Sequence, residues 1–271
     1  MTSINGNYNS NSYYYYPNTD ENNDNKRYRY QQRNPMNAEI GWLLASSATA
    51  LIYKLLPSFS NPFLKQMPKE HLNNHSYHDV FMKAFEESGL KKKGLKLINV
   101  TDPTTDVGKG LNAFFAPVKK VIAFNHDKAS ISGFHELGHA MNNMNGGIGK
   151  ILQKLRKPGY TIAGLMGTVA LFSRNKPKGE KREPIDVVVD NAHVIASVGM
   201  LPTVLEESLA SYKGIKAAKK AGLSAPLIKN LRKFYGKALL SYAGYAFVTG
   251  LSVYAAGKIM DKFTRPKIVE Y

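Results

Sequence analysis

The sequence predicts an α-rich α+β fold, in which a small folded unit with a short β-sheet is joined to apolar, membrane-embedded helices. Three observations predict this class. Strand-like runs occur in one narrow part of the chain, at residues 95–100 and 119–125. Apolar residues at helical spacing dominate elsewhere. Several stretches carry no charge, and the longest, residues 238–257, has the ~20 residues that a bilayer-spanning helix needs.

The composition limits the chemistry and the partners. The 271-residue chain has no cysteine, which excludes disulfides, Cys-type zinc fingers and thiol nucleophiles, so His, Asp or Glu must hold any metal ion. The net charge of +17 suits nucleic acid, an anionic membrane surface or an acidic substrate. Basic residues flank apolar stretches, and no nucleic-acid-binding motif lies between them. We therefore expect a lipid bilayer as a partner and no nucleic acid.

The N-terminal segments come first along the chain. Residues 1–36, including "NSNSYYYYPNTDENNDN", are rich in Asn and Tyr and poor in aliphatic residues, which predicts a disordered tail without a cleaved signal peptide. Residues 37–60 contain "IGWLLASSATALIY", an uncharged run that predicts an anchor-like helix. The run is short for a span, so an interfacial helix or a core helix also remains open.

Residues 70–271 are expected to form the main domain, which begins with a small α+β unit. "HDVFMKAFEESGL" (78–90) has apolar residues at helical spacing, and Gly89 is placed to end the helix. The two strand-like runs, "LKLINV" and "KKVIAFN", follow with "NAFFAP" (112–117) between them. The next helix is expected from Ser130 to Asn143, ended by "NGG" (145–147).

That helix carries the motif "HELGH", in which His135 and His139 lie four residues apart. Residues at this spacing share one helix face, so both imidazoles can bind one metal ion. Glu136 stands beside them, where a zinc hydrolase needs a carboxylate to take a proton from the attacking water. The pattern favours one Zn²⁺ per chain over two histidines that merely lie on an amphipathic helix.

Apolar segments follow the motif. Residues 158–205 predict an apolar hairpin, with "PGYTIAGLMGTVALFS" and "NAHVIASVGMLPTVL" joined by a charged loop. The uncharged stretch at residues 238–257 is rich in small residues that let membrane helices pack closely. The number of true spans stays open.

A third metal ligand is expected after the hairpin, because hydrolytic zinc usually has three protein ligands. Glu207 is preferred, because Ala210 lies one turn further on and, with Gly138, lets the two helices approach closely. Glu206 is the competitor; it points about 100° away on the same helix and is expected to be exposed. Asp186, Asp190 and His193 come next.

Three of these segments together resemble the membrane-associated gluzincin peptidases, a family that includes the CAAX prenyl protease and the bacterial heat-shock membrane protease. "NAFFAPVKKVIAFN" (112–125) is similar to its edge-strand segment, "HELGHA" (135–140) to its zinc helix, and "ESLAS" (207–211) to its third-ligand motif. The order of the motifs carries the resemblance, which covers residues 78–220. It implies a small zincin-like (minigluzincin) unit and a zinc-dependent metalloendopeptidase that hydrolyses peptide bonds at or in a membrane.

The resemblance also implies roles for single residues. His135, His139 and Glu207 would hold zinc, and Glu136 would be the general base. The segment that holds Asn112, Ala113, Val121, Ile122, Ala123 and Phe124 would offer an edge strand, centred on 121–124, to an extended peptide or protein substrate. Ser211 stands where many members carry Asp, which leaves the subfamily open.

Ser211 and His193 are candidates for supporting the ligands, and His193 could equally be a polar residue at a helix end. Two other classes of function remain: an inactive membrane scaffold of the same fold, and a basic protein that binds nucleic acid or anionic lipid.

Overall fold

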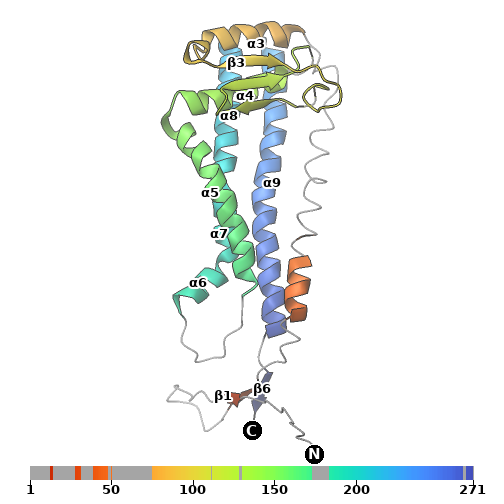
Figure 1. Ribbon diagram of the computed structural model, residues 1–271, viewed down its shortest axis with the longest axis vertical. Helices are drawn as coiled ribbons and strands as arrows, with labels where there is room; N and C mark the ends of the chain where they lie inside the picture. The colour runs from red at the N-terminus through yellow and green to blue at the C-terminus, as the bar shows by residue number, and fades with distance from the viewer. Residues whose placement is uncertain are drawn as a thin grey trace, which may run out of the picture. The chain divides into compact units, whose positions relative to one another are not determined.

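The computed structural model describes residues 13–14, 28–31, 39–47, 50, 75–110, 112–127, 130–172, 183–264 and 267–270. These residues are mostly helical and include two small three-stranded sheets. The α-rich α+β class predicted from the sequence is therefore confirmed (Figure 1).

The chain divides into two compact units. One comprises Met1–Ile52, Leu165–Ile195 and Gly250–Tyr271, and we call it the terminal unit. The other comprises Tyr53–Gly164 and Ala196–Thr249. The candidate site lies wholly within this second unit, which we call the site unit.

The sheet of the site unit has the order β3-β5-β4. Strand β5 (Val121–Phe124) pairs in parallel with β3 (Lys96–Asn99) and antiparallel with β4 (Phe114–Ala116). All four residues of β5 are buried, as expected for an uninterrupted apolar run in the middle of a sheet.

Two predicted helices cover this sheet and are confirmed. Helix α3 (His75–Glu87) is followed by Gly89, whose φ of +68° allows the chain to leave the helix, and by the 3₁₀ turn η1 (Lys91–Lys93). Helix α4 (Ser130–Met144) ends just before the NGG sequence. Phe81 of α3 joins the layers, because its ring meets Phe124 and Phe134 edge-on at centroid distances of 4.9 and 5.4 Å.

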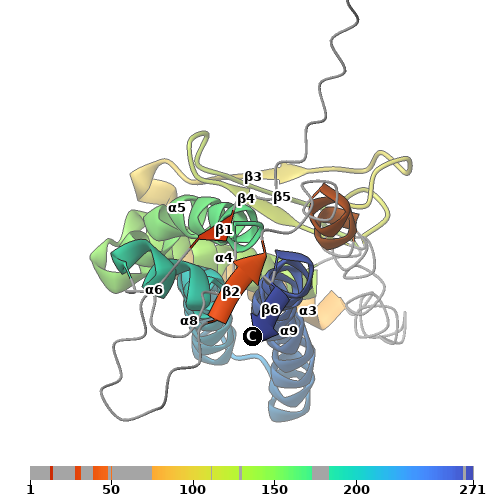
Figure 2. The ribbon, with the colours of Figure 1, turned by 90° about the horizontal axis from the view of Figure 1, so that it is seen from below.

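Helix α4 lies between the sheet and α8 (Leu201–Lys220), as the view from below shows (Figure 2). Helix α9 (Ala225–Thr264) begins beside the same core, where Ile228, Leu231 and Tyr235 are buried. The uncharged stretch 238–257 is therefore the middle of a 40-residue helix rather than a separate element.

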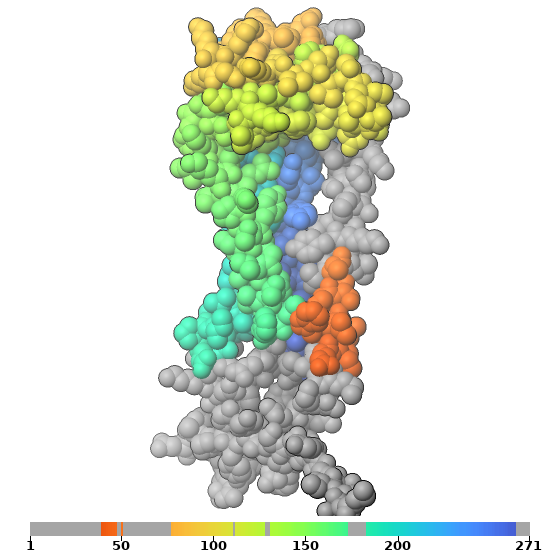
Figure 3. Space-filling model, in the orientation of Figure 1, coloured from red at the N-terminus to blue at the C-terminus, as the bar shows by residue number. Residues whose placement is uncertain are grey.

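The predicted apolar hairpin consists of four helices. Helix α5 (Gly147–Ala170) has a basic first half and an apolar second half, and α6 (Pro184–Asp190) and α7 (Ala192–Gly199) lead to α8. In the site unit, α5 exposes the large apolar side chains Ile148, Ile151, Leu155 and Ile162. Figure 3 shows α5, in green, at the surface of the molecule.

Two helical segments of the described residues are long and apolar enough to cross a membrane: Ala192–Lys220 and Ala225–Phe263. The first joins α7 to α8, and the second is nearly all of α9. The predicted apolar stretch in α5 does not reach this length and hydropathy.

The terminal unit contains a second sheet, in which β2 (Tyr28–Gln31) pairs antiparallel with β1 (Tyr13–Tyr14) and with β6 (Lys267–Glu270). The prediction of a disordered tail over residues 1–36 is therefore wrong for these two strands, where tyrosine favours extended backbone. Residues 39–47 are helical, in line with the predicted anchor-like helix, while most of 48–60 lies outside the described residues.

Candidate metal centre

Three nitrogen and oxygen atoms converge between α4 and α8. The Nε2 atoms of His135 and His139 lie 3.0 Å apart, and Oε2 of Glu207 lies 3.0 Å from the first and 3.4 Å from the second. Four ligands held tetrahedrally at about 2.0–2.1 Å from zinc are separated from one another by about 3.3 Å. The spacing and donor types therefore fit three corners of a tetrahedral metal site.

The second nitrogen of each imidazole has its own partner. His139 Nδ1 lies 2.9 Å from Oε1 of Glu206, to which an Nδ1–H donates, and His135 Nδ1 lies 3.2 Å from the Ser211 hydroxyl. Protons held at the Nδ1 atoms leave the Nε2 lone pairs facing the centre of the triangle. Ser211 thus contacts a site histidine, as its candidacy from the sequence required.

Glu206 is fully buried, at 0% exposure, so the expectation that it is exposed is wrong. Its Oε1 accepts hydrogen bonds from His139 and from the Asn142 side chain, and its Oε2 pairs with Arg156 at 2.9 Å. The neighbouring Glu207 is 3% exposed and turns Oε2 to the two Nε2 atoms. Both carboxylates belong to the site, with different contacts.

Arg156 of α5 completes the cluster. Its Nη1 and Nη2 atoms each lie 2.9 Å from a carboxylate oxygen, one on Glu206 and one on Glu207. With Glu136 beside the histidines, the site holds three carboxylates, of which Glu206 and Glu207 pair with the one guanidinium. A bound divalent cation would neutralise the charge that remains, and so the cluster could hold a metal ion.

The charges and the burial of the site shift the pKa values of its ionisable groups. Burial lowers the pKa of His139, but its hydrogen bonds to Glu206 and Glu207 outweigh this and raise it from the ordinary 6.5 to about 10. Burial raises the pKa of the Glu136 carboxyl, against the lowering effect of the two histidines. The metal-free cluster thus retains a proton that a metal ion would displace.

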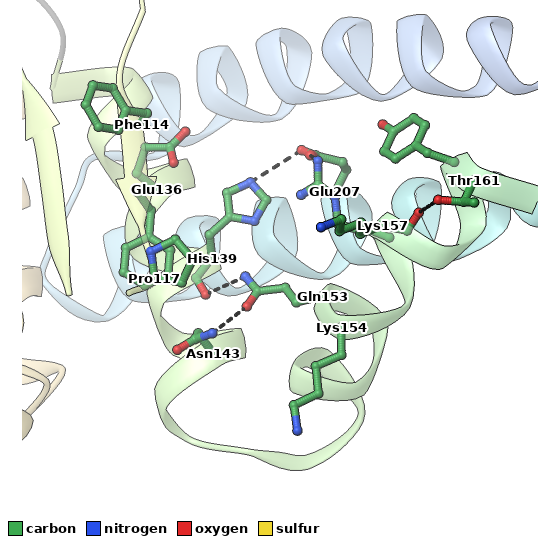
Figure 4. A pocket seen from close by; sticks show the side chains of 13 residues that line it. Phe114, Pro117, Glu136, His139, Asn143, Gln153, Lys154, Lys157, Thr161 and Glu207 are labelled. Atoms are coloured by element: carbon green, nitrogen blue, oxygen red, sulfur yellow. Dashed lines mark hydrogen bonds and ion pairs between the residues drawn. The ribbon is translucent and has the colours of Figure 1, made fainter. Parts of the chain in front are cut away.

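Glu136 faces a pocket of about 690 Å³ that opens beside the triangle. Figure 4 shows Glu136 and His139 between Phe114 and Pro117 on one side and the α5 residue Lys157 on the other. The backbone of Phe115 lies near the Glu136 carboxylate and lowers its pKa. A substrate in this pocket would therefore meet the carboxylate, the metal ligands and β4 together.

The predicted edge strand is in the wrong place. Residues Val121, Ile122, Ala123 and Phe124 form β5, whose two edges are taken up by β3 and β4, so no backbone edge remains for a substrate. The open edge beside the pocket belongs to β4. Asn112 and Ala113 precede it: the Asn112 side chain accepts a hydrogen bond from the Ala113 N–H, and Ala113 is buried in the core.

The remaining candidates belong to the terminal unit and not to the site unit. His193 belongs to the terminal unit, where its ring packs on Tyr254 at a centroid distance of 5.3 Å, and Asp186 and Asp190 belong to the same unit. Sequence reasoning missed Arg156, Asn142, Gln153 and Phe115. Arg156 had no local signal, because it is one of 37 Lys and Arg residues and lies fifty positions from its partners.

Comparisons with protein-family models, with curated proteins and with solved structures find no match to the chain.

Proposed function

We propose that this protein is a zinc-dependent metalloendopeptidase that acts at a membrane, with one Zn²⁺ held by His135, His139 and Glu207. The observation that carries the proposal is the triangle of two imidazole nitrogens and one carboxylate oxygen, 3.0 to 3.4 Å apart, with Glu136 beside it. Three ligands with one open position are characteristic of catalytic rather than structural zinc. Two imidazoles and one carboxylate also suit zinc better than magnesium or calcium, which favour oxygen ligands.

His135, His139 and Glu207 would hold the zinc ion, which would supply the positive charge that lowers the pKa of a water molecule and polarises the scissile carbonyl. Glu136 takes the proton from the attacking water and passes it to the leaving amine. The backbone of Phe115 beside this carboxylate favours its ionised form, which is the form that can act as a base. His139 is held by Glu206 and His135 contacts Ser211, so neither ring turns away during the reaction.

The substrate is an extended peptide that adds to the free edge of β4. This strand is at the edge of the sheet, and Phe114, Phe115 and Pro117 line the pocket with Glu136. Backbone pairing along β4 would lay the peptide across the site without requiring a particular sequence, while Phe114, 49% exposed, offers an apolar contact to a substrate side chain.

Two observations support attachment to a membrane. The most apolar stretches of Ala192–Lys220 and Ala225–Phe263 are only 39% and 28% buried, whereas a core helix of a soluble protein is mostly buried. The large apolar side chains that these helices expose in the site unit include Leu201, Leu205, Leu240 and Phe247. Hydrocarbon chains of lipid would cover them.

The site lies where three helices change from charged to apolar. On α5 the change comes after Lys157, on α8 before Glu206, and on α9 after Lys237. Arg156 contacts Glu206 and Glu207, and Tyr242, just past Lys237, interacts electrostatically with both Arg156 and Glu207. The three changes therefore occur at one level of the site unit. We place the catalytic centre at the boundary between water and lipid.

Glu136→Gln tests the proposal, because the amide has a similar shape but cannot take a proton from water. Detergent-purified wild-type protein and the variant are incubated with fluorescein-labelled casein, an unfolded general substrate. We expect the wild type to cleave it, and the variant to keep its zinc but lose more than 99% of the rate, about the loss expected without a general base. Equal cleavage by both proteins would exclude Glu136 as the base, and the absence of cleavage by either would count against a general endopeptidase.

A further inference from the structure

Arg156 bridges two carboxylates that leave the α8 helix in different directions. Adjacent residues of a helix point about 100° apart, so Glu206 and Glu207 do not share partners by default. Arg156 nevertheless reaches both, with Nη1 on Oε2 of Glu206 and Nη2 on Oε1 of Glu207, each at 2.9 Å. The planar guanidinium can make these two contacts at once, which a lysine ammonium on the same helix could not reproduce in the same geometry.

The contact with Glu207 gives the two oxygens of that carboxylate different partners. Oε1 is taken by Arg156, and Oε2 faces the Nε2 atoms of His135 and His139. A carboxylate that bound a metal ion through both oxygens would have to share Oε1 between two cations, the metal ion and the guanidinium, which repel each other. Arg156 thus selects a single oxygen of Glu207 for the metal.

The contact with Glu206 acts on the other side of the site. Arg156 occupies Oε2, which leaves Oε1 to accept from His139 Nδ1 and from Asn142. Both oxygens of Glu206 therefore have partners, so Glu206 supports His139 and does not compete with Glu207 for the metal ion.

Helix α5 is fixed against its neighbours around Arg156. Three residues earlier, the Gln153 side chain donates to the backbone carbonyl of His139 and accepts from Asn143, which ties α5 to α4. Three residues later, a Cβ on Gly159 would overlap the carbonyl oxygen of Gly199. The guanidinium therefore enters the site from a helix whose position is set on both sides.

We infer that Arg156 is a positioning residue that keeps Glu207 as a one-oxygen metal ligand and keeps Glu206 on His139. This inference deepens the proposed function and rests on it, because it requires a metal ion in the site. It assigns to α5, which supplies no ligand, control of the coordination number of the metal.

Cobalt(II) tests the inference without a substrate, because four-coordinate Co²⁺ absorbs visible light several-fold more strongly than five-coordinate Co²⁺. The full-length protein in detergent is stripped of metal and titrated with Co²⁺. We expect strong visible absorption for the wild type and for Lys150→Ala, an exposed control on the same helix. For Arg156→Ala, we expect affinity to fall about 10- to 100-fold, the usual effect of losing a residue that supports a ligand. The remaining complex should absorb several-fold more weakly.

Arg156→Lys keeps the charge but not the two-pronged contact, and it decides the outcome if Arg156→Ala does not fold. We expect it to give the weak spectrum as well, and added guanidinium, below denaturing concentrations, to restore the strong spectrum in Arg156→Ala. A wild-type spectrum and affinity in Arg156→Lys would overturn the inference, because positive charge alone would then suffice. So would failure of guanidinium to change the spectrum of a folded Arg156→Ala.

The proposed metal site and the proposed role of Arg156 would fail in different ways. If the wild type binds no Co²⁺, the metal site of the proposed function is wrong, and the inference falls with it. If the wild type binds Co²⁺ and both Arg156 variants match it, the metal site stands and only the role of Arg156 is wrong.

Discussion

Gly138 of α4 lies against Ala210 of α8 so closely that a Cβ on the glycine would overlap the carbonyl oxygen of Ala210. A second such contact joins the same helices, where a Cβ on Gly214 would overlap the carbonyl oxygen of Phe134. Glu207 stands one turn before Ala210, and His135 and His139 flank Gly138 in the sequence. Because Gly138 and Gly214 have no side chains, α4 and α8 can come close enough to bring their ligands together.

Gly138→Ala should force α4 and α8 apart, because the overlap involves backbone that cannot rotate out of the way. We expect a loss of about 1–3 kcal/mol of stability, as for other overpacked sites, together with loss of bound metal. Gly236→Ala is the matched control, since no heavy atom lies within 4 Å of its added methyl group. It should be neutral or stabilise α9 by about 0.5–1 kcal/mol. Thermal unfolding and metal content measure both effects, and wild-type metal content in Gly138→Ala would contradict the packing argument.

Substitution of the two adjacent glutamates should have different effects. Glu207→Ala removes a ligand and should abolish zinc binding on dialysis. Glu206→Ala leaves the three ligands and the Arg156–Glu207 contact, but it removes the acceptor of the His139 Nδ1–H, so we expect about 1–3 kcal/mol less stability, with zinc retained at weaker affinity. The exposed Glu86→Ala should change stability by no more than about 0.5 kcal/mol. If Glu206→Ala lost all zinc while Glu207→Ala retained it, the assignment of the ligand would have to be reversed.

Metal binding should release a proton. The pKa of His139 is raised to about 10 in the metal-free protein, so this imidazole is protonated at neutral pH. Its charge stabilises the metal-free fold below pH 6.5, its ordinary pKa, and this stabilisation is lost as the pH rises through about 10. Zinc needs the neutral imidazole, so binding near pH 7 should release about one proton and strengthen as the pH rises. Calorimetry in buffers of different ionisation enthalpy counts the protons, and no release would contradict the raised pKa.

The membrane boundary can be located chemically because the chain has no cysteine. Phe247, 69% exposed on α9, should lie in lipid, whereas Val118, 95% exposed after β4, should lie in water. In native membranes, a water-soluble maleimide should label Val118→Cys rapidly and Phe247→Cys hardly at all, while both should react once the protein is unfolded. Comparable labelling of both variants in the membrane would show that α9 is not covered by lipid.

Local spacing was enough to predict part of the site from the sequence. His135 and His139 share a helix face by their four-residue separation, and the small residues Gly138 and Ala210 indicated where a second helix could approach. The helices α3 and α4 and the strands β3 and β5 were also predicted, because periodicity and turn residues mark them directly.

What the sequence could not supply depends on contacts between distant segments. Arg156, which pairs with both buried glutamates, comes from another helix. The adjacent glutamates in the sequence therefore did not indicate which partners each carboxylate would have. The order of the sheet is likewise a tertiary property. The apolar run in β5 signals a central strand, but the resemblance of the whole segment to an edge strand hid that signal. Strand β2 pairs with β6 from the opposite end of the chain, and amino-acid composition cannot predict a pairing between distant segments.

The account is tested most directly by elemental analysis of the full-length protein purified in detergent, with His139→Ala and Glu136→Gln beside it. His139 contributes one corner of the triangle, while Glu136 stands next to it as the base. We predict about one zinc per chain in the wild type and in Glu136→Gln, and none in His139→Ala, because a site that loses one of three ligands does not hold zinc through dialysis. No zinc in the wild type, or as much zinc in His139→Ala as in the wild type, would contradict the metal centre on which the proposed peptidase activity depends.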